Sequence, residues 1–354
     1  MKKEIQKAET LNTSFYQKPE HFESSKESIF SKSWQLIGHE GIMDDLSVYP
    51  FRFIDGMLDE PLILTKNNDK LLCMSNVCTH RGNLLAPQSK HVQKLVCNYH
   101  GRRFGLDGKF EYMPEFEGVE GFPRECDNLK NLPLYQWGPF LFTSIEPVFD
   151  FVNIIESLNN RIGFLDLHAL KERQDLSKNY SVKAHWALYC DNYLEGFHIP
   201  FVHTGLNEVV DYSEYESVLY DYCNLQIGYG KNETECFDLP SDHPDFGKQV
   251  AAYYYWIFPN MMFNFYPWGL SINVVEPINL ENTRIRYYTF VLDEGRFEGS
   301  AGADLNKVEL EDEEIVENVQ HGIKSRFYQT GRFSPKMEKG VHHFHQLISE
   351  FMPI

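Results

Sequence analysis

Four potential metal ligands occur as two short pairs in the first third of the 354-residue chain. Cys78 and His80 form a Cys-x-His pair, and Cys97 and His100 form a Cys-x-x-His pair. A strand-like run precedes each pair and a glycine follows it, so each pair is expected at a loop tip. A structural zinc site is the alternative, but zinc fingers usually group their cysteines together and their histidines together. One thiolate and one imidazole per loop favours a Rieske [2Fe–2S] cluster, in which thiolates hold one iron and imidazoles hold the other.

A second constellation lies further along the chain, where His198 and His203 are five positions apart. In a continuous helix this spacing would turn the two side chains about 140° apart, so they would not converge on one ion. Pro200 lies between them and disfavours helix at Ile199, which allows the chain to bend. Two imidazoles and one carboxylate on one face of an ion form the facial triad of non-haem Fe(II) oxygenases, which leaves positions open for O2 and substrate. The carboxylate must come from elsewhere in the chain.

The two constellations together resemble one known family. The sequence is similar to the large (α) subunit of the Rieske non-haem iron ring-hydroxylating oxygenases. The resemblance extends over roughly residues 30–350. The segments that carry it read WQLIGHE, SNVCTHRGNLL, LVCNYHGRRFGLDGKFEYMP and NYLEGFHIPFVHTG. The last of them is similar to members of the branch that oxidises choline and carnitine.

The resemblance implies that an aspartate on a late helix is the third iron ligand. An acidic run offers one aspartate, and Asp312 is the residue that we expect to bind. Glu311, Glu313 and Glu314 compete with it by position. A solvated acidic helix start is the plainer interpretation of those three.

The resemblance also implies a role for Glu195, three residues before His198. The family carries an acidic residue there, which is Asp in most ring-hydroxylating members. Glu195 is therefore expected to contact its own His198 and His100 of the partner subunit, because a carboxylate on the free N–H of an imidazole fixes its tautomer. Such a contact implies a ring of subunits, most simply a homotrimer. A surface glutamate is the alternative, and Asp191, one helical turn earlier, is expected either to support the iron site or to cap a helix.

The chain reads as an α+β protein with three parts. A helical arm over residues 1–32 precedes an all-β Rieske domain over 33–145, and a catalytic domain follows over 146–354. The resemblance makes the catalytic domain a helix-grip fold, in which helices cover an antiparallel sheet. Within it, the alternation of apolar and aromatic residues predicts strands at 182–189, 251–258, 261–267, 271–276 and 283–292.

Helical spacing predicts two late helices. The first covers residues 310–329, with an apolar stripe made of Ile315, Val316, Val319 and Ile323. The second lies at the C-terminus, where the apolar residues follow helical spacing and the run His342-His343-x-His345 is expected on the polar side.

Composition excludes several classes of partner. The 33 basic and 51 acidic residues give a charge of −18, which repels phosphate backbones, so no nucleic-acid partner is expected. The first residues lack an apolar signal core, and the aromatic stretch 251–270 contains two prolines and two asparagines, so no membrane segment is expected. Seven irregularly spaced cysteines predict reduced thiols in the cytoplasm.

The predicted activity is that of an oxygenase component. The chain has no GxGxxG fingerprint, so a separate NAD(P)H-dependent reductase, of flavin or ferredoxin type or both, must supply electrons to the cluster and the iron. O2 and a small organic compound are the substrates. Glu195 and the Tyr- and Trp-rich strands favour a quaternary ammonium or betaine-like compound, which is monooxygenated or demethylated. The alternatives are dioxygenation of an aromatic or heteroaromatic ring, and a Rieske electron carrier with a ligand-binding domain.

Overall fold

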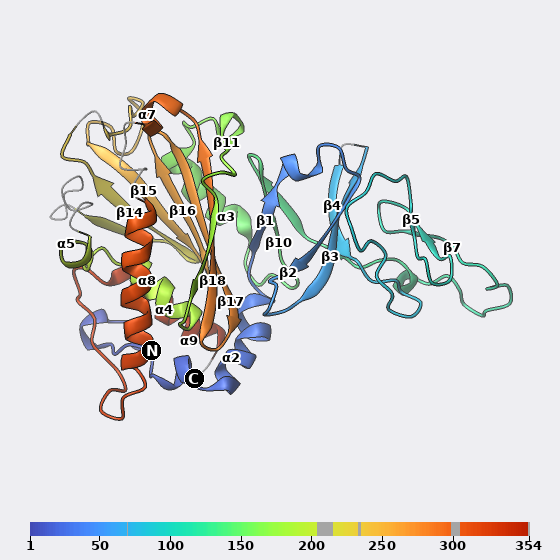
Figure 1. Cartoon of the computed structure of the whole chain (residues 1–354), viewed down its shortest axis with the longest axis horizontal. Coiled ribbons are helices and arrows are strands. Elements are labelled where there is room, and N and C mark those ends of the chain that lie inside the picture. Colours follow the sequence, from blue (N-terminus) through green and yellow to red (C-terminus); the bar gives the residue numbers. More distant parts are fainter. Residues whose placement is uncertain (69, 204–214, 233–234, 299–304, 353–354) are drawn as a thin grey trace. The chain divides into compact units, whose positions relative to one another are not determined.

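A computed structural model describes residues 1–68, 70–203, 215–232, 235–298 and 305–352 (Figure 1). The chain divides into two compact units. One consists of Ser31–Val148, and the other combines Met1–Phe30 with Phe149–Ile354. The first unit begins two residues before the predicted Rieske domain and ends three residues after it. The N-terminal arm belongs to the same unit as the catalytic domain.

The unit Ser31–Val148 is built from three antiparallel sheets. They are β1 (Gln35–His39), β10 (Phe140–Thr143) and β9 (Leu134–Trp137); β2 (Val48–Phe53), β3 (Glu60–Asn67), β4 (Lys70–Ser75) and β8 (Asn131–Leu132); and β5 (Leu95–Val96), β6 (Arg103–Phe104) and β7 (Phe110–Tyr112). One buried cluster contains Ile63, Met74 and Phe104, and the side chains of Cys78 and Cys97 lie within it. The two cysteines are therefore held by the same core that stabilises the strands.

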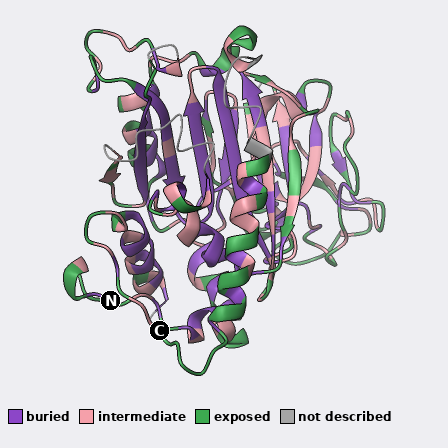
Figure 2. Cartoon of the chain, turned by 60° about the vertical axis from the view of Figure 1, so that its left-hand side comes forward, coloured by how far each residue is buried: buried purple, intermediate pink, exposed green. Residues whose placement is uncertain are grey.

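The second unit contains one antiparallel sheet of eight strands. The strands are β11 (Lys171–Glu172), β12 (Lys178–Val182), β13 (Glu216–Leu219), β14 (Cys223–Tyr229), β15 (Val250–Ile257), β16 (Met261–Tyr266), β17 (Gly269–Asn279) and β18 (Asn282–Val291). From β13 to β18 each strand pairs with the next, and both β11 and β12 pair with β18. The central strands β14 to β17 are almost wholly buried, whereas β11, β12 and β13 are largely exposed or half-buried (Figure 2). The aromatic strands that the sequence predicted, β15 to β18, are confirmed.

Helices complete the second unit. The structure contains α1 (Ser14–Gln17), α2 (Pro19–Ser25), α3 (Phe151–Ile162), α4 (Trp186–Tyr193), α5 (Ile199–Val202), α7 (Glu294–Glu298), α8 (Leu305–Gly322) and α9 (Lys339–Phe351). α4 and α8 lie in front of the sheet in Figure 1, and α4 packs on both β17 and α8. The mixed architecture agrees with the predicted α+β class. None of the helices in the described part of the chain is both long and apolar enough to cross a membrane.

The strand predicted at 182–189 is wrong. β12 ends at Val182, and α4 begins at Trp186. His185 is the residue before the helix, and its Nδ1 accepts a hydrogen bond of 3.3 Å from the backbone N–H of Ala187. This side-chain cap starts a helix in a segment whose apolar residues alternate as in a strand, because a cap satisfies a backbone donor that the first turn leaves free.

The apolar stripe predicted for α8 is also wrong in part. Ile315 and Val319 are exposed, whereas Glu309, Val316 and Gln320 are buried. Val316 and Ile323 of the predicted stripe are buried as expected, but Ile315 and Val319 lie on the outer side, and the polar residues Glu309 and Gln320 take the inner positions. α8 packs on α4 and on β12, and Figure 2 shows that one side of the helix is buried and the other exposed. A rule that assigns apolar residues to the interior cannot detect a helix whose inner face carries ligands.

The C-terminal helix α9 is confirmed, but its histidines are not on a polar side. His342 and His345 are buried. His345 Nδ1 accepts a hydrogen bond of 3.1 Å from the backbone N–H of Leu11 in the N-terminal arm. The arm is also held by the backbone N–H of Thr10, which donates to the carbonyl of Gly331 at 3.1 Å. Buried hydrogen bonds thus join the two ends of the chain.

The buried cap residue predicts acid sensitivity. Burial lowers the pKa of His185 to about 3, against roughly 6.5 in an unfolded chain. The neutral form is required in the fold, so its contribution is complete above about pH 6.5 and is lost as the pH falls below that value. We expect His185 to remove about 2 kcal/mol from the free energy of unfolding at pH 5. His185→Asn keeps a capping side chain without a titrating ring, and urea unfolding of both proteins at pH 7 and pH 5 measures the difference. If both proteins lost the same free energy of unfolding between pH 7 and pH 5, the acid sensitivity could not be assigned to His185.

Candidate metal centres

The two Cys-His loops in the first unit have the same backbone geometry. Cys78 O accepts from the N–H of Gly82 at 3.0 Å, and Cys97 O accepts from the N–H of Gly101 at 2.9 Å. Both glycines have a φ of +72°, a left-handed conformation that residues with a Cβ rarely adopt. The glycine after each pair therefore closes a tight turn, and each turn presents one cysteine and one histidine.

The four side chains of these loops are placed as a two-iron cluster needs them. Cys78 and Cys97 are each 2% exposed. The rings of His80 and His100 are half-buried, with centroids 4.7 Å apart and planes at 73°. His80 Nδ1 is buried and has no hydrogen-bond partner among the described residues, so its lone pair is available to a metal. Two thiols in the core and two imidazoles nearer the surface fit a cluster with inequivalent irons.

Hydrogen bonds favour the ionised form of one of these thiols. Burial alone would raise the pKa of Cys97, but the backbone N–H groups of Tyr99 and His100 and the side chain of Asn83 bring it below the usual value. Asn83 Nδ2 lies 3.6 Å from Cys97 Sγ, so a residue of the first loop contacts the thiol of the second. No spacing pattern in the sequence points to Asn83 as a partner of the thiol. Hydrogen bonds to cluster sulfurs are a recognised means of setting a reduction potential.

Arg102, which follows the second loop, is a packing residue. Its guanidinium is buried, donates to Asp127 Oδ1 at 2.7 Å and lies over the Phe110 ring at 4.9 Å. Thr79 Oγ1 in the first loop donates to the carbonyl of Asp127 at 2.8 Å. Asp127 therefore ties both loops together through buried hydrogen bonds.

The second constellation lies around the short helix α5 and on α8 of the other unit. His198 precedes α5, and His203 follows it. The expectation that Pro200 keeps Ile199 out of a helix is wrong: α5 begins at Ile199, and Pro200 occupies its first turn. Proline is tolerated there because the first-turn N–H groups have no intrahelical acceptor. One helical turn between the two histidines, rather than a kink, brings both rings to one place.

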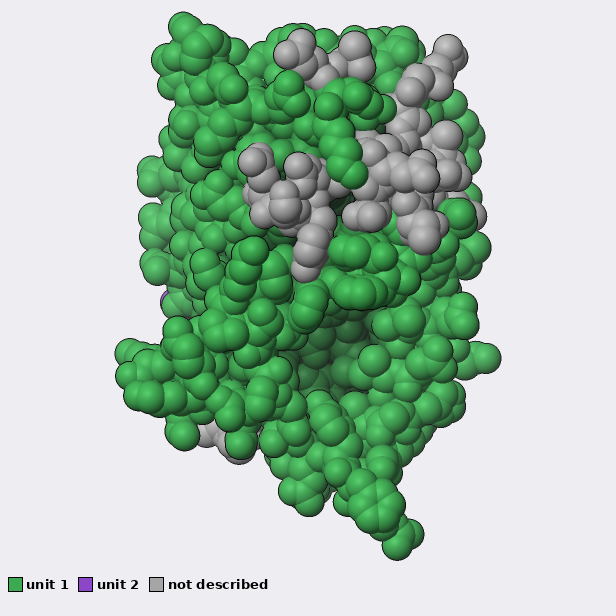
Figure 3. All heavy atoms as spheres, turned by 90° about the vertical axis from the view of Figure 1, so that its left-hand side faces the viewer, with its two compact units in different colours: residues 1–30, 149–354 green, residues 31–148 purple. Residues whose placement is uncertain are grey.

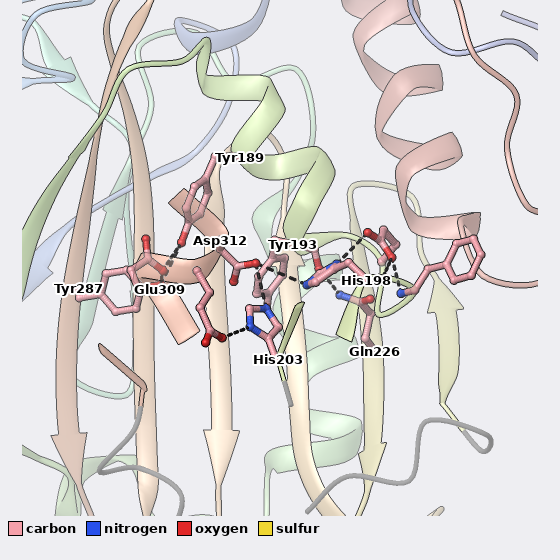
Figure 4. A network of polar contacts seen from close by, with 11 residues as sticks. Tyr189, Tyr193, His198, His203, Gln226, Tyr287, Glu309 and Asp312 are labelled. Atoms are coloured by element: carbon pink, nitrogen blue, oxygen red, sulfur yellow. Dashed lines mark hydrogen bonds and ion pairs between the residues drawn. The ribbon is translucent and has the colours of Figure 1, made fainter. Parts of the chain in front are cut away.

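The structure brings His198, His203 and Asp312 together (Figure 4). His203 Nε2 lies 3.0 Å from Asp312 Oδ1, and His198 Nε2 lies 3.5 Å from the same oxygen. One donor atom from each of the three residues lies within 4.8 Å of the others. Two imidazole nitrogens and one carboxylate oxygen at this spacing suit a mononuclear Fe(II) site. Asp312 reaches the site from α8.

The Nδ1 atom of each imidazole is hydrogen-bonded to a glutamate carboxylate. Glu195 Oε1 lies 2.8 Å from His198 Nδ1, and Glu311 Oε2 lies 2.8 Å from His203 Nδ1. Each carboxylate accepts the Nδ1 proton, so the Nε2 lone pairs face Asp312. Burial would lower the pKa of His203, but Asp312 and Glu311 together raise it. The acidic surroundings that raise this pKa also favour a cation at the site.

Glu311 therefore orients the His203 ring, a role that could not be predicted from the sequence, where Glu311 was only an alternative to Asp312 as the iron ligand. The position directly before the ligand was the available signal, but no spacing rule says that its carboxylate reaches His203. Glu314 is exposed, and Glu313 is half-buried with an Oε1 that has no partner in the described part of the chain.

Removing the charge of Glu311 should weaken the mononuclear site. In Glu311→Gln the side chain is an uncharged amide, which stabilises the proton on His203 Nδ1 less than a carboxylate does. We therefore expect the affinity for iron to fall about 10- to 100-fold. Competition with a chelator, followed by metal analysis, measures the change, and the cluster absorption serves as internal reference. Glu314→Gln, a substitution at an exposed site on the same helix, should bind iron normally. Equal affinity in the two variants would contradict the role given to Glu311.

Asp191 does not face the three candidate ligands. Its Oδ2 accepts from the Tyr16 hydroxyl at 2.9 Å, and its Oδ1 lies 2.8 Å from His345 Nε2. His345 Nδ1 already accepts a backbone N–H, so Nε2 carries the proton and donates to Asp191. Asp191 thus connects α4 to the N-terminal arm and to α9, and it caps no helix.

Polar and aromatic side chains cover the face of the sheet that is turned toward α4. Tyr193 OH donates to Asn264 Oδ1 at 2.7 Å, and Gln226 Nε2 donates to the carbonyl of Tyr193 at 2.8 Å. The strand register places Tyr254 on the same face, opposite both Gln226 and Asn264. Its ring lies 5.9 Å from that of Tyr266, edge to face. Figure 3 shows that the surface of this unit is hollowed.

Both halves of the chain match known protein families. The model of the ring-hydroxylating α subunit catalytic domain matches residues 169–354, more than half of the chain, and that of the Rieske [2Fe–2S] domain matches residues 34–123. The chain is 29% identical to the carnitine monooxygenase oxygenase subunit of Escherichia coli, over 98% of this chain and 94% of that one. It is 26% identical to the chloroplastic choline monooxygenase of Arabidopsis thaliana, over 97% and 83%. A crystal structure of the quaternary ammonium Rieske monooxygenase CntA with an inhibitor superposes with a TM-score of 0.78, at 25% identity, over 97% and 95%.

Proposed function

The chain belongs to the ring-hydroxylating oxygenase α-subunit family, and from that premise we propose that it monooxygenates a small quaternary ammonium compound. It is a Rieske-type oxygenase that carries a [2Fe–2S] cluster and a mononuclear iron. As the oxygenase component of a multicomponent system, it works with a reductase, O2 and an organic substrate. A reductase of flavin type, ferredoxin type or both, fed by NAD(P)H, fits the absence of a nucleotide fingerprint in this sequence. We place the protein in the cytoplasm, where its thiols stay reduced.

The geometry supports one assignment of the ligands. Cys78, His80, Cys97 and His100 would hold the cluster. His198, His203 and Asp312 would hold the iron through the two Nε2 atoms and Oδ1. When bound, the iron supplies O2 activation and the cluster supplies electrons. The chain's own part is to fix both imidazole tautomers through Glu195 and Glu311.

Electron delivery is proposed to cross between subunits. Glu195 holds His198 Nδ1 through Oε1, while Oε2 accepts the backbone N–H of His198 at 3.1 Å. The Glu195 side chain is 15% exposed, so a further donor can still reach its carboxylate. We assign that donor to His100 of the partner subunit, in a homotrimer. This contact would couple the protonation of the cluster imidazole to the iron site.

The observation that carries the substrate class is the tyrosine cluster beside the site. Tyr193 is the last residue of α4, five positions before His198, and Tyr254 and Tyr266 lie on the adjoining strands β15 and β16. Burial raises the pKa of all three phenols, that of Tyr254 to about 12, so they remain neutral and keep electron-rich ring faces. Trp268 stacks on Tyr266 with centroids 5.0 Å apart. Such faces attract a quaternary ammonium by about 0.5–2 kcal/mol per contact.

The test is substrate-dependent O2 uptake. Purified protein, a compatible reductase and NADH are supplied with choline, carnitine, other betaines and a set of aromatic acids, and products are identified by mass. We expect turnover of quaternary ammonium compounds, with one oxygen atom entering the carbon next to nitrogen. The hydroxylated carbon then breaks its bond to nitrogen, so the products are an aldehyde and a dealkylated amine. Turnover of aromatic acids alone would contradict the proposal.

A further inference from the structure

A buried carboxyl group beside the iron site has no role in the account above. Glu309 lies three residues before Asp312 on α8, on the same side of the helix. It is 2% exposed and contacts no basic side chain among the described residues. A buried glutamate without a cation to pair with is costly as an anion, so its presence requires an explanation.

Two phenols surround one oxygen of this group and leave the other free. The Tyr189 hydroxyl donates to Glu309 Oε2 at 2.7 Å, and the Tyr287 hydroxyl donates to the same atom (Figure 4). The two hydroxyls are 2.9 Å apart. Glu309 Oε1 is buried and has no partner in the part of the chain that the structure describes. In the neutral acid the proton therefore lies on Oε1, because Oε2 already accepts hydrogen bonds.

This arrangement accommodates both states of the group. Burial raises the pKa of Glu309 to about 8, while the hydrogen bonds from Tyr287 and Tyr189 lower it and limit the shift. The acid is therefore mostly protonated at neutral pH, and the two phenols stabilise the anion once the proton has left. The titratable groups that face it are Tyr189 of α4, Tyr287 of β18, Tyr180 of β12, and Asp312 and Glu313 of α8 itself.

We propose that Glu309 is a proton donor for the oxygenation, giving up the proton on Oε1 while Tyr189 and Tyr287 stabilise the carboxylate that remains. The inference rests on the proposed monooxygenase activity. In that reaction a substrate C–H bond and the O–O bond break, one oxygen atom forms the hydroxyl, and the other leaves as water. The reductase supplies two electrons, and two protons are consumed. Glu309 supplies one of the two protons and is reprotonated from water between turnovers.

Infrared spectroscopy tests the proton itself, independently of turnover. Wild-type protein should show the C=O stretch of a protonated carboxyl group at neutral pH, and the Glu309 band is identified as the part of this signal that Glu309→Gln lacks and Glu313→Gln retains. The band should vanish as the pH rises through about 8. In Tyr287→Phe, which removes one donor to the anion, the band should persist to higher pH. A spectrum without this band in the wild type at pH 7 would overturn the inference.

Single-turnover kinetics test the use of the proton. Pre-reduced enzyme is mixed with O2 and whichever substrate the panel supports, and product is quantified against time. Glu309→Gln should keep its iron and cluster but form product about 100-fold more slowly, and Glu314→Gln should match the wild type. In the wild type the rate should fall as the pH rises through the infrared midpoint. In Tyr287→Phe that fall should move to higher pH together with the band.

Two outcomes would contradict the donor role. One is a Glu309→Gln variant that forms product at the wild-type rate. The other is a Tyr287→Phe variant in which the infrared midpoint moves but the pH dependence of product formation does not. The second comparison remains decisive if Glu309→Gln loses iron. A wild-type protein that oxidises no compound of the panel would instead count against the proposed function.

Discussion

His198→Ala should abolish oxygenation and leave the Rieske cluster intact. The substitution removes one of three donor atoms that lie within 4.8 Å of one another, and it also leaves Glu195 without its imidazole partner. We expect about two irons per chain in place of about three, because only the mononuclear site is lost. Product formation should fall below detection, whereas the absorption and EPR signals of the reduced cluster should match those of the wild type.

His321→Ala is a suitable control for this experiment, because His321 is an exposed histidine of α8. It should bind three irons and turn over normally. Full product formation by His198→Ala would refute the mononuclear assignment. The same metal analysis separates the oxygenase from the electron-carrier alternative, since a carrier with a vestigial second site would bind only two irons in the wild type.

Glu195→Gln should retain both metals but slow electron transfer from the cluster to the iron. The amide can still accept the N–H of His198, so the local geometry is largely preserved. It cannot carry the negative charge that stabilises a protonated imidazole on either side. We expect reoxidation of the cluster in a single turnover to slow about 10- to 100-fold, measured by stopped-flow absorption.

Glu195→Asp is the matched variant, because it keeps the carboxylate and shortens its reach by one methylene. It should retain more of the transfer rate than the amide does. Unchanged reoxidation in Glu195→Gln would remove the bridging role. The proposed contact with His100 of the partner subunit also predicts that dissociated monomers transfer no electrons to the iron.

Local spacing was enough to find six of the seven candidate ligands, and the family resemblance supplied the seventh, Asp312. Each Cys-His pair lies within four residues and is followed by a glycine that closes the turn, so residue type and separation describe the cluster loops almost completely. His198 and His203 flank one short helix, and their convergence is likewise a property of six consecutive residues. The strands β15 to β18 were predictable because long runs of aromatic and β-branched residues have little competing helical pattern.

Helix faces and long-range partners were decided by the tertiary structure. The sequence pattern of α8 placed Ile315 and Val319 inside, yet the helix buries Glu309 and Gln320 because its inner face lines the site. Glu311 orients His203 across 108 positions of the chain, and His345 meets Asp191 across 154. Hydrophobic periodicity describes only the transfer of apolar surface from water. It cannot report where buried polar groups satisfy one another, since each such pair depends on the position of two elements that are distant in sequence.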